Sequence, residues 1–344
     1  MQRFLLIAFV ASIGVLTATS MNNASTFKDK GDVGLLSVED MLSKLGDKPL
    51  LHAIDKVDPA KVKLGEDLVF NGRTMYNGKK SRKISNHFVC TDCHNTTSEF
   101  KDISSQNSAE RLKFAEDNGI PFLPGSTLWG IYDRTTFYND DYVKKYGDLV
   151  DNARDTLSNA VQLCAKYCSS GRYLDEWEVE AIMHYFKSNQ LHLSDLNLSK
   201  SEKKNLSKYQ KLDDQEKKDM IAMLKSKYRQ SYSATFMETM PTDQRKYGEG
   251  GNAENGKKIY EKSCMFCHED KRVTYLHIDN GKLSGRFFWS NIKNYKDQNV
   301  YQIVRHGTYS KAGRKQYMPH FTKEKMSDDQ LNDLVAYIKQ IAGK

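Results

Sequence analysis

Proline is scarce in this chain, and long hydrophobic runs are absent beyond the first 20 residues. The 344 residues include only six prolines, and 28% of all residues are charged. The mean hydropathy is −0.68. This composition excludes collagen-like, mucin-like and wholly disordered chains, and also a polytopic membrane protein. It is typical of a globular, mostly helical protein, and the length predicts about two domains.

The single apolar run lies at the N-terminus. Arg3 precedes an apolar stretch at residues 5–16, which is too short to span a bilayer comfortably. Small residues at 18–20 suit a signal peptidase, so we expect residues 1–20 to be a signal peptide, with a retained anchor as the alternative. Export to the periplasm would bring the cysteines into an oxidising compartment.

Basic residues outnumber acidic residues, and the formal net charge is +8. A basic exported protein can meet an anionic lipid, an acidic redox partner or a small anion. Export makes nucleic acid the least expected partner, so we predict no nucleic-acid binding.

Four of the six cysteines form two copies of one motif, CTDCH at 90–94 and CMFCH at 264–268. C-x-x-C-H is the attachment signature of c-type haem, because two thiols on one helical turn reach both vinyl groups and the next histidine lies beneath the iron. Zinc would require further Cys/His pairs at matching spacing, and a redox dithiol would require a βαβ setting. The sequence therefore predicts two covalently bound haem c groups. The predicted attachment cysteines are Cys90, Cys93, Cys264 and Cys267, and the predicted proximal iron ligands are His94 and His268.

Each motif is followed by a capped amphipathic helix. Residues 327–330 form a capping box, and residues 175–178 form an acid-capped relative of it. A tyrosine follows each cap by ten residues, Tyr337 and Tyr185. The chain is thus a diverged tandem repeat that resembles the class I cytochrome c fold twice, and we predict a mostly α protein. The expected segments are a signal peptide at 1–20, an N-terminal arm at 21–60, a first domain at 61–190, a helical connector at 191–250 and a second domain at 251–344. Within the arm we expect a short helix near 38–45.

The sixth iron ligand of the second haem is predicted from a Met-Pro pair. Met318 and Pro319 lie shortly before the capping box that opens at Ser327. Class I cytochromes typically present their distal methionine from such a loop, and a thioether ligand raises the reduction potential. His306, His320 and Met326 are the alternatives.

The first haem has no comparable loop. Between His94 and Asp175 the chain contains no methionine and no further histidine, but it contains Cys164 and Cys168. Either thiolate could bind iron and lower the potential, and the spacing to the helix cap does not choose between them. A Cys164–Cys168 disulfide is the alternative expectation in an exported protein.

Here the sequence resembles the thiosulfate dehydrogenases, whose first haem has His/Cys ligation. The similar stretches are residues 86–94, 128–134, 157–164 and 170–174, within a resemblance that covers roughly residues 64–190. The related SoxA-type sulfur-oxidation cytochromes share the Cys-ligated haem.

The resemblance implies a ligand for the first iron. The ligand cysteine of that family is followed seven residues later by a glycine, and Gly171 stands in this position relative to Cys164. Ala160 and Cys168 depart from the pattern, because the family has an arginine and a serine at these places.

From the resemblance we expect oxidation of thiosulfate to tetrathionate, or the reverse reaction, at the first haem. Cys164 would react with sulfur, while Arg134 and Arg172 would hold the sulfonate or pair with a haem propionate. Electrons would pass to the second haem and on to a partner cytochrome, a membrane oxidase or a quinol complex. The alternative is a non-catalytic dihaem electron carrier.

Overall fold

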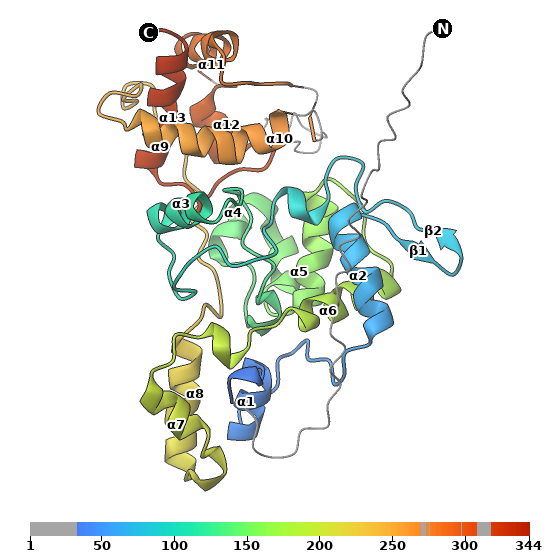
Figure 1. The fold of residues 1–344 in the computed structure, drawn as a ribbon. Helices are drawn as coiled ribbons and strands as arrows, with labels where there is room; N and C mark the ends of the chain where they lie inside the picture. Colours follow the sequence, from blue (N-terminus) through green and yellow to red (C-terminus); the bar gives the residue numbers. More distant parts are fainter. Residues whose placement is uncertain (1–32, 270–272, 275, 297, 308–317) are drawn as a thin grey trace, which may run out of the picture. The chain divides into compact units, whose positions relative to one another are not determined.

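The computed structural model describes residues 33–269, 273–274, 276–296, 298–307 and 318–344 (Figure 1). The expected signal peptide lies outside these ranges. Among the described residues, helices dominate, and the only strands are the two of a short hairpin, β1 (Met75–Tyr76) and β2 (Lys79–Lys80). Within the same residues, no helix has both the length and the apolar character that a membrane crossing requires.

The helices follow one another along the whole described chain. The α-helices are α1 (Val38–Leu45), α2 (Pro59–Asn71), α3 (Ser108–Asp117), α4 (Val143–Tyr146), α5 (Leu157–Leu163), α6 (Glu176–Ser188), α7 (Lys200–Leu206), α8 (Asp214–Ser226), α9 (Ala253–Ile259), α10 (Phe266–His268), α11 (Lys282–Asn294), α12 (Val300–His306) and α13 (Asp328–Ile341). Two π-helical turns, Cys164–Cys168 and Tyr260–Met265, continue α5 and α9. Short 3₁₀ helices span Val33–Leu35, Cys90–Asp92, Ile131–Asp133, Asp140–Tyr142, Gly147–Ala153, Leu193–Asp195 and Tyr209–Lys211.

The two capped helices begin where the sequence predicts. The backbone N–H of Asp175 donates to the Glu178 carboxylate at 2.9 Å at the start of α6. At the start of α13, the Gln330 N–H donates to the Ser327 hydroxyl at 3.1 Å, and the Ser327 N–H donates back to the Gln330 side chain at 3.0 Å. These bonds satisfy amide groups that the first turn of a helix leaves without partners.

Each capped helix crosses the helix that precedes a C-x-x-C-H motif, and the two crossings are alike. In the α2–α6 crossing, a Cβ atom on Gly65 would collide with the carbonyl oxygen of Ala181. In the α9–α13 crossing, a Cβ atom on Gly256 would collide with the carbonyl oxygen of Asp333. The tyrosine ten residues after each cap lies at the same crossing. Glycine therefore lets each pair of backbones approach closely, at matching positions of the two repeats.

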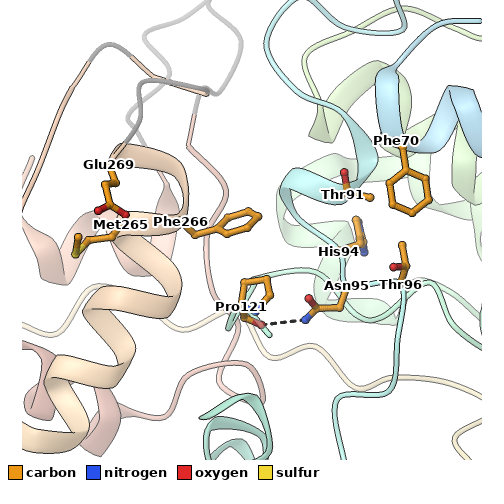
Figure 2. Close-up of a pocket in the computed structure, with 9 residues that line it drawn as sticks. All are labelled: Phe70, Thr91, His94, Asn95, Thr96, Pro121, Met265, Phe266 and Glu269. Atoms are coloured by element: carbon orange, nitrogen blue, oxygen red, sulfur yellow. Dashed lines mark hydrogen bonds between the residues drawn. The ribbon is translucent and has the colours of Figure 1, made fainter. Parts of the chain in front are cut away.

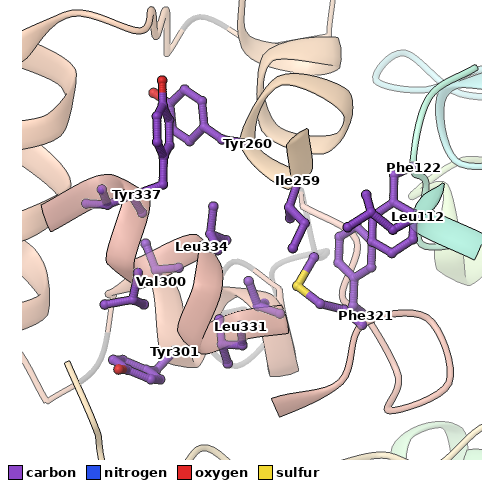
Figure 3. Packing of buried hydrophobic residues seen from close by; sticks show 14 of the residues in the cluster. Leu112, Phe122, Ile259, Tyr260, Val300, Tyr301, Phe321, Leu331, Leu334 and Tyr337 are labelled. Atoms are coloured by element: carbon purple, nitrogen blue, oxygen red, sulfur yellow. The ribbon is translucent and has the colours of Figure 1, made fainter. Parts of the chain in front are cut away.

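The buried hydrophobic residues form three clusters, and one of them joins distant parts of the sequence. The cluster around α9 and α13 also contains Leu112, Ala115 and Phe122, which come from the segment expected to be the first domain (Figure 3). A second cluster surrounds α2 and α6. The 61–190 segment thus contributes side chains to both cores.

The third cluster belongs to the connector and the N-terminal arm. Leu206 of α7 and Leu224 of α8 are fully buried together with Val38 and Met41 of α1. The apolar side chains of the connector contact this helix of the arm, and Ile103 and Trp129 of the 61–190 segment also pack against the cluster. An amphipathic helix needs one apolar partner surface, and here α1 supplies it.

Candidate haem sites

A single cavity brings together the first C-x-x-C-H motif and both remaining cysteines. We call it the His94 cavity; its volume is about 220 Å³. Cys90, Cys93 and His94 line it on one side, and Cys164 and Cys168 line it from the π-helical turn. The sequence analysis named both cysteines as candidate ligands of the first iron, and the fold brings them to His94 across about 70 positions of chain.

His94 is oriented as an iron ligand would be. Its Nδ1 lies 2.6 Å from the carbonyl oxygen of Ser126, so Nδ1 carries the proton and Nε2 keeps its lone pair. Burial lowers the pKa of His94, which favours the neutral, ligating form. Gly125 lies against the ring, where a Cβ atom would come within 2.5 Å of Nδ1.

The second motif repeats this arrangement with different partners. His268 Nδ1 lies 2.8 Å from the carbonyl oxygen of Leu276, and burial lowers its pKa. Burial also raises the pKa of Cys264 to about 12, as it does for Cys90 of the first motif. Both histidines therefore present Nε2 as the remaining ligand atom.

The two motifs lie close together in the folded chain. The Phe122 N–H donates to the carbonyl oxygen of Lys262 at 3.0 Å, and the Ser263 hydroxyl donates to the Phe122 carbonyl at 2.6 Å. Figure 2 shows the Phe266 ring extending from the second motif towards the side of His94, across a gap of about 480 Å³. Burial, followed by the nearby Cys267, raises the pKa of Cys93.

Cys164 and Cys168 are separate thiols, without the disulfide that was the alternative expectation. A hydrogen bond from Cys164 is the largest cause that lowers the pKa of Cys168 to about 7, and the same bond raises the pKa of Cys164. The Tyr146 hydroxyl lies 3.4 Å from the Cys168 sulfur. The hydrogen bonds thus favour Cys168 as the anionic sulfur of the pair, whereas the family resemblance selects Cys164 as the iron ligand. A π-helical turn of this kind is frequent at functional sites.

Sequence reasoning missed the polar residues around these thiols. Tyr138, Tyr142 and Tyr146 all line the His94 cavity, and their spacing of four is a helical signal that could have grouped them. Lys145 is largely buried beside them, and burial lowers its pKa to about 8. Its ammonium donates to Nδ1 of His320 at 2.5 Å.

The structure places Met318, the predicted ligand of the second haem, at the cavity of the first motif. It lines the His94 cavity together with Pro319 and His320, and none of the second motif's cysteines or its histidine lines that cavity. Residues 308–317, which lead into this loop, lie outside the described ranges. Ligation of the second haem by Met318 stays a prediction.

The two candidate arginines have different surroundings. Arg172 does not line the cavity; it forms an ion pair with Glu178 at 2.6 Å and donates to the carbonyl oxygens of Lys83 and Arg82. Its guanidinium is thus engaged elsewhere, and we do not place it in the site. Arg134 lines the cavity, is 5% exposed, and donates to the carbonyl oxygen of Thr127 at 2.8 Å.

Comparison with known proteins supports one part of this assignment. Residues 251–338 match the family model described as cytochrome c oxidase, cbb3-type, subunit III. The match covers the second motif and the helices α9 to α13, so this part of the chain is a c-type cytochrome domain, which implies covalently bound haem c. Searches of curated proteins and of solved structures found no match. The match therefore supports haem-based electron transfer for residues 251–338.

Proposed function

We propose that this protein is a periplasmic dihaem cytochrome with two tandem class I domains, residues 61–190 and 251–344. The support is the repetition of one design. Each half has a C-x-x-C-H motif, a histidine whose Nδ1 bonds a carbonyl oxygen, and a helix crossing closed by a buried glycine. The family model matches residues 251–338, and the 61–190 segment has the same kinds of motif, histidine contact and helix crossing.

The residues around the first motif can hold a haem c, because they include the thiols and the histidine that haem c requires. His94, with Nδ1 bonded to the Ser126 carbonyl, lines the same cavity as the thiols of Cys90 and Cys93, and the thiols of the Cys164–Cys168 π-helical turn line it too. When bound, haem c supplies a one-electron donor and acceptor. In our proposal Cys164 is the sulfur ligand in the first half and Met318 the sulfur ligand in the second.

We propose thiosulfate oxidation as the reaction, with the paired thiols of Cys164 and Cys168 as the observation that carries it. A simple carrier would need only one thiolate, as a ligand that sets the haem potential, so the second thiol of the pair favours chemistry on sulfur. Cys168 is the better anion and accepts a hydrogen bond from Cys164. In our proposal Cys164 would lose its proton on serving as an iron ligand, because metal ligands bind deprotonated, and its thiolate would be the nucleophile.

The chemistry balances with two thiosulfate ions. The Cys164 thiolate and the outer sulfur of one thiosulfate form a sulfur–sulfur bond, and two electrons leave to the electron acceptor. The outer sulfur of a second thiosulfate then attacks that of the bound group and releases tetrathionate, and the Cys164 thiolate is restored. The acceptor class is a redox partner cytochrome, a membrane oxidase or a quinol complex.

The neighbouring side chains suit an anionic sulfur substrate. Lys145 brings a cation next to Cys168, and the Tyr146 hydroxyl can donate to a sulfur anion. These groups supply the positive charge and donors that a small sulfur anion needs, without Arg172.

Thiosulfate turnover with an artificial one-electron acceptor tests this function. We expect thiosulfate to reduce the acceptor and tetrathionate to form in a ratio of one per two electrons. Protein that carries two haems but yields no tetrathionate would reject the reaction.

A non-catalytic electron carrier is the second candidate, and the proximity of the two motifs favours it. Lys262 next to the second motif is hydrogen-bonded to Phe122 of the first half, so two haems bound here would be neighbours. A carrier would be reduced and reoxidised by partner proteins at full rate, with no response to thiosulfate.

A further inference from the structure

Two buried cations meet on one wall of the His94 cavity, and they come from different halves of the chain. Arg134 and Lys325 are 5% and 6% exposed and both line the cavity. They flank one ring, because the Arg134 guanidinium lies 4.1 Å and the Lys325 ammonium 5.2 Å from the centroid of Tyr232. Lys325 belongs to the cytochrome domain matched at residues 251–338.

The buried charges around them do not balance. Glu99 is the carboxylate that pairs with this group: it lies 2.5 Å from Arg111 and 3.4 Å from Lys325. Asp133, next to Arg134, accepts from the Leu191 N–H, and burial raises its pKa to about 7. Among the residues that the structure describes, the cations Arg111, Arg134 and Lys325 thus share one ion-paired carboxylate, that of Glu99.

The excess of buried positive charge destabilises the fold unless further anions lie beside it. Burial lowers the pKa of Arg134, and it lowers the pKa of Lys325 to about 7. A buried cation is stable when a counterion and hydrogen-bond acceptors face it. The wall of the cavity is therefore suited to about two negative charges.

We propose that Lys325, together with Arg134, binds the two propionate carboxylates of the first haem, so that the second cytochrome domain completes the pocket of the first haem. The inference rests on the proposed haem at Cys90–His94. A haem carries two propionates, which match the surplus in number and sign. The new element is the role of Lys325, a positioning residue contributed from the other domain.

The backbone of the Lys325 segment is held by hydrogen bonds to three other segments of the chain. Arg305 donates to the Met326 carbonyl oxygen at 2.8 Å, and the Lys323 N–H donates to the carbonyl oxygen of Thr235 at 3.1 Å. Arg111 also donates to the carbonyl oxygen of Lys325 at 3.4 Å. This fixation lets the side chain keep its position at low entropic cost.

A cation at the first haem favours Fe(II) over Fe(III), so Lys325 raises the potential of that haem. We therefore test Lys325→Met and Lys325→Arg in the full-length, haem-loaded protein. Lys323→Met is the matched control, because Lys323 lies two residues away and is exposed. The readouts are haem content by pyridine haemochrome assay, a spectroscopic redox titration that resolves both haems, and the propionate bending bands in resonance Raman spectra.

We expect Lys325→Met to lower the potential of the first haem and to shift one set of propionate bands. The second haem should be unchanged, Lys325→Arg should restore both signals in large part, and Lys323→Met should have no effect. A lower potential with unmoved propionate bands would overturn the proposal, since Lys325 would then act only on Glu99.

Two further outcomes also decide against the proposal. Unmoved potentials and bands with a raised KM for thiosulfate would assign Lys325 to the substrate anion instead. A single haem in the wild-type protein would overturn the proposed dihaem function together with this inference, whereas two haems without an effect of Lys325→Met would overturn this inference alone.

Discussion

At the residue scale, the two thiols of the π-helical turn have different tasks, and substitution separates them. Cys164→Gly removes the proposed nucleophile, so we expect thiosulfate turnover to fall on the order of 10³-fold or more. Cys168→Ser leaves the Cys164 nucleophile in place and keeps a hydroxyl beside it, so this variant should retain substantial activity. Turnover of thiosulfate with an artificial acceptor measures both effects.

Haem content is the control for this pair. Attachment depends on the four C-x-x-C-H cysteines, so the pyridine haemochrome assay should still find two haems per chain in both variants. Full activity of Cys164→Gly would reject the thiol mechanism and favour the electron carrier. Equal damage from both substitutions would show that the two sulfurs act as one unit.

Met318 is the second residue whose role an experiment can assign. As the ligand of the second haem, its thioether stabilises Fe(II), so Met318→Ala should lower the potential of the second haem and open it to added ligands. The potential of the first haem should move less. A redox titration that resolves both haems makes the measurement, and Met326→Ala is a control because Met326 is the buried alternative in the same region.

The structure makes the outcome for Met318 informative in both directions. Met318 lines the His94 cavity, so a shift confined to the first haem would place its thioether there. Two unchanged potentials would show that Met318 binds neither iron.

At the scale of secondary-structure elements, the two glycine crossings hold each haem motif against its capped helix. Gly256→Ala would push a Cβ atom into the backbone of α13, and overpacking of this kind costs about 1–3 kcal/mol in the free energy of unfolding. Gly65→Ala should act similarly between α2 and α6. Urea unfolding monitored by circular dichroism measures the change.

Lys257→Ala is the control for the crossing in the second half. Lys257 is exposed and adjacent to Gly256, so its loss should change the free energy of unfolding by less than about 0.5 kcal/mol. If Gly256→Ala were as mild as Lys257→Ala, the close approach of α9 and α13 would not limit stability.

The elements themselves are the part of the fold that the sequence predicted well. Residues 38–45 were expected to be helical and form α1, and the caps at Asp175 and Ser327 open α6 and α13. Capping and periodicity act over one or two turns, so they can be recognised without knowledge of distant residues. The partner of each helix face is a long-range property, and the contact of α1 with α8 was not predicted for that reason.

At the scale of the whole molecule, Glu99 connects the two halves. Its carboxylate pairs with Arg111 of α3 and with Lys325 of the second cytochrome domain. Burial alone would raise the pKa of Glu99, but the charges of Arg111 and Lys325 exceed this effect and lower it overall. Glu99→Gln leaves both cations with less compensation, so we expect a loss of about 3–5 kcal/mol in the free energy of unfolding.

The same pair predicts a direction for the pH dependence. Because the pKa of Glu99 is lower in the folded state than in the unfolded state, its contribution is present above about pH 4.3 and is lost progressively as the pH falls below this value. Unfolding curves measured from pH 6 to pH 3 should fall more steeply for the wild-type protein than for Glu99→Gln. Parallel curves would show that Glu99 is not the group responsible.

Local spacing in the sequence was enough to predict a haem-attachment motif within residues 251–338 and a mostly helical protein. The tandem repeat of two cytochrome domains stays a prediction. Two C-x-x-C-H motifs and two caps can be recognised in any context. The folded structure was needed to show that Arg172 pairs with Glu178 away from the His94 cavity and that Lys325 of the other half lines this cavity. Those relations depend on which buried surfaces and charges pair across distant segments, and no local pattern in the chain encodes them.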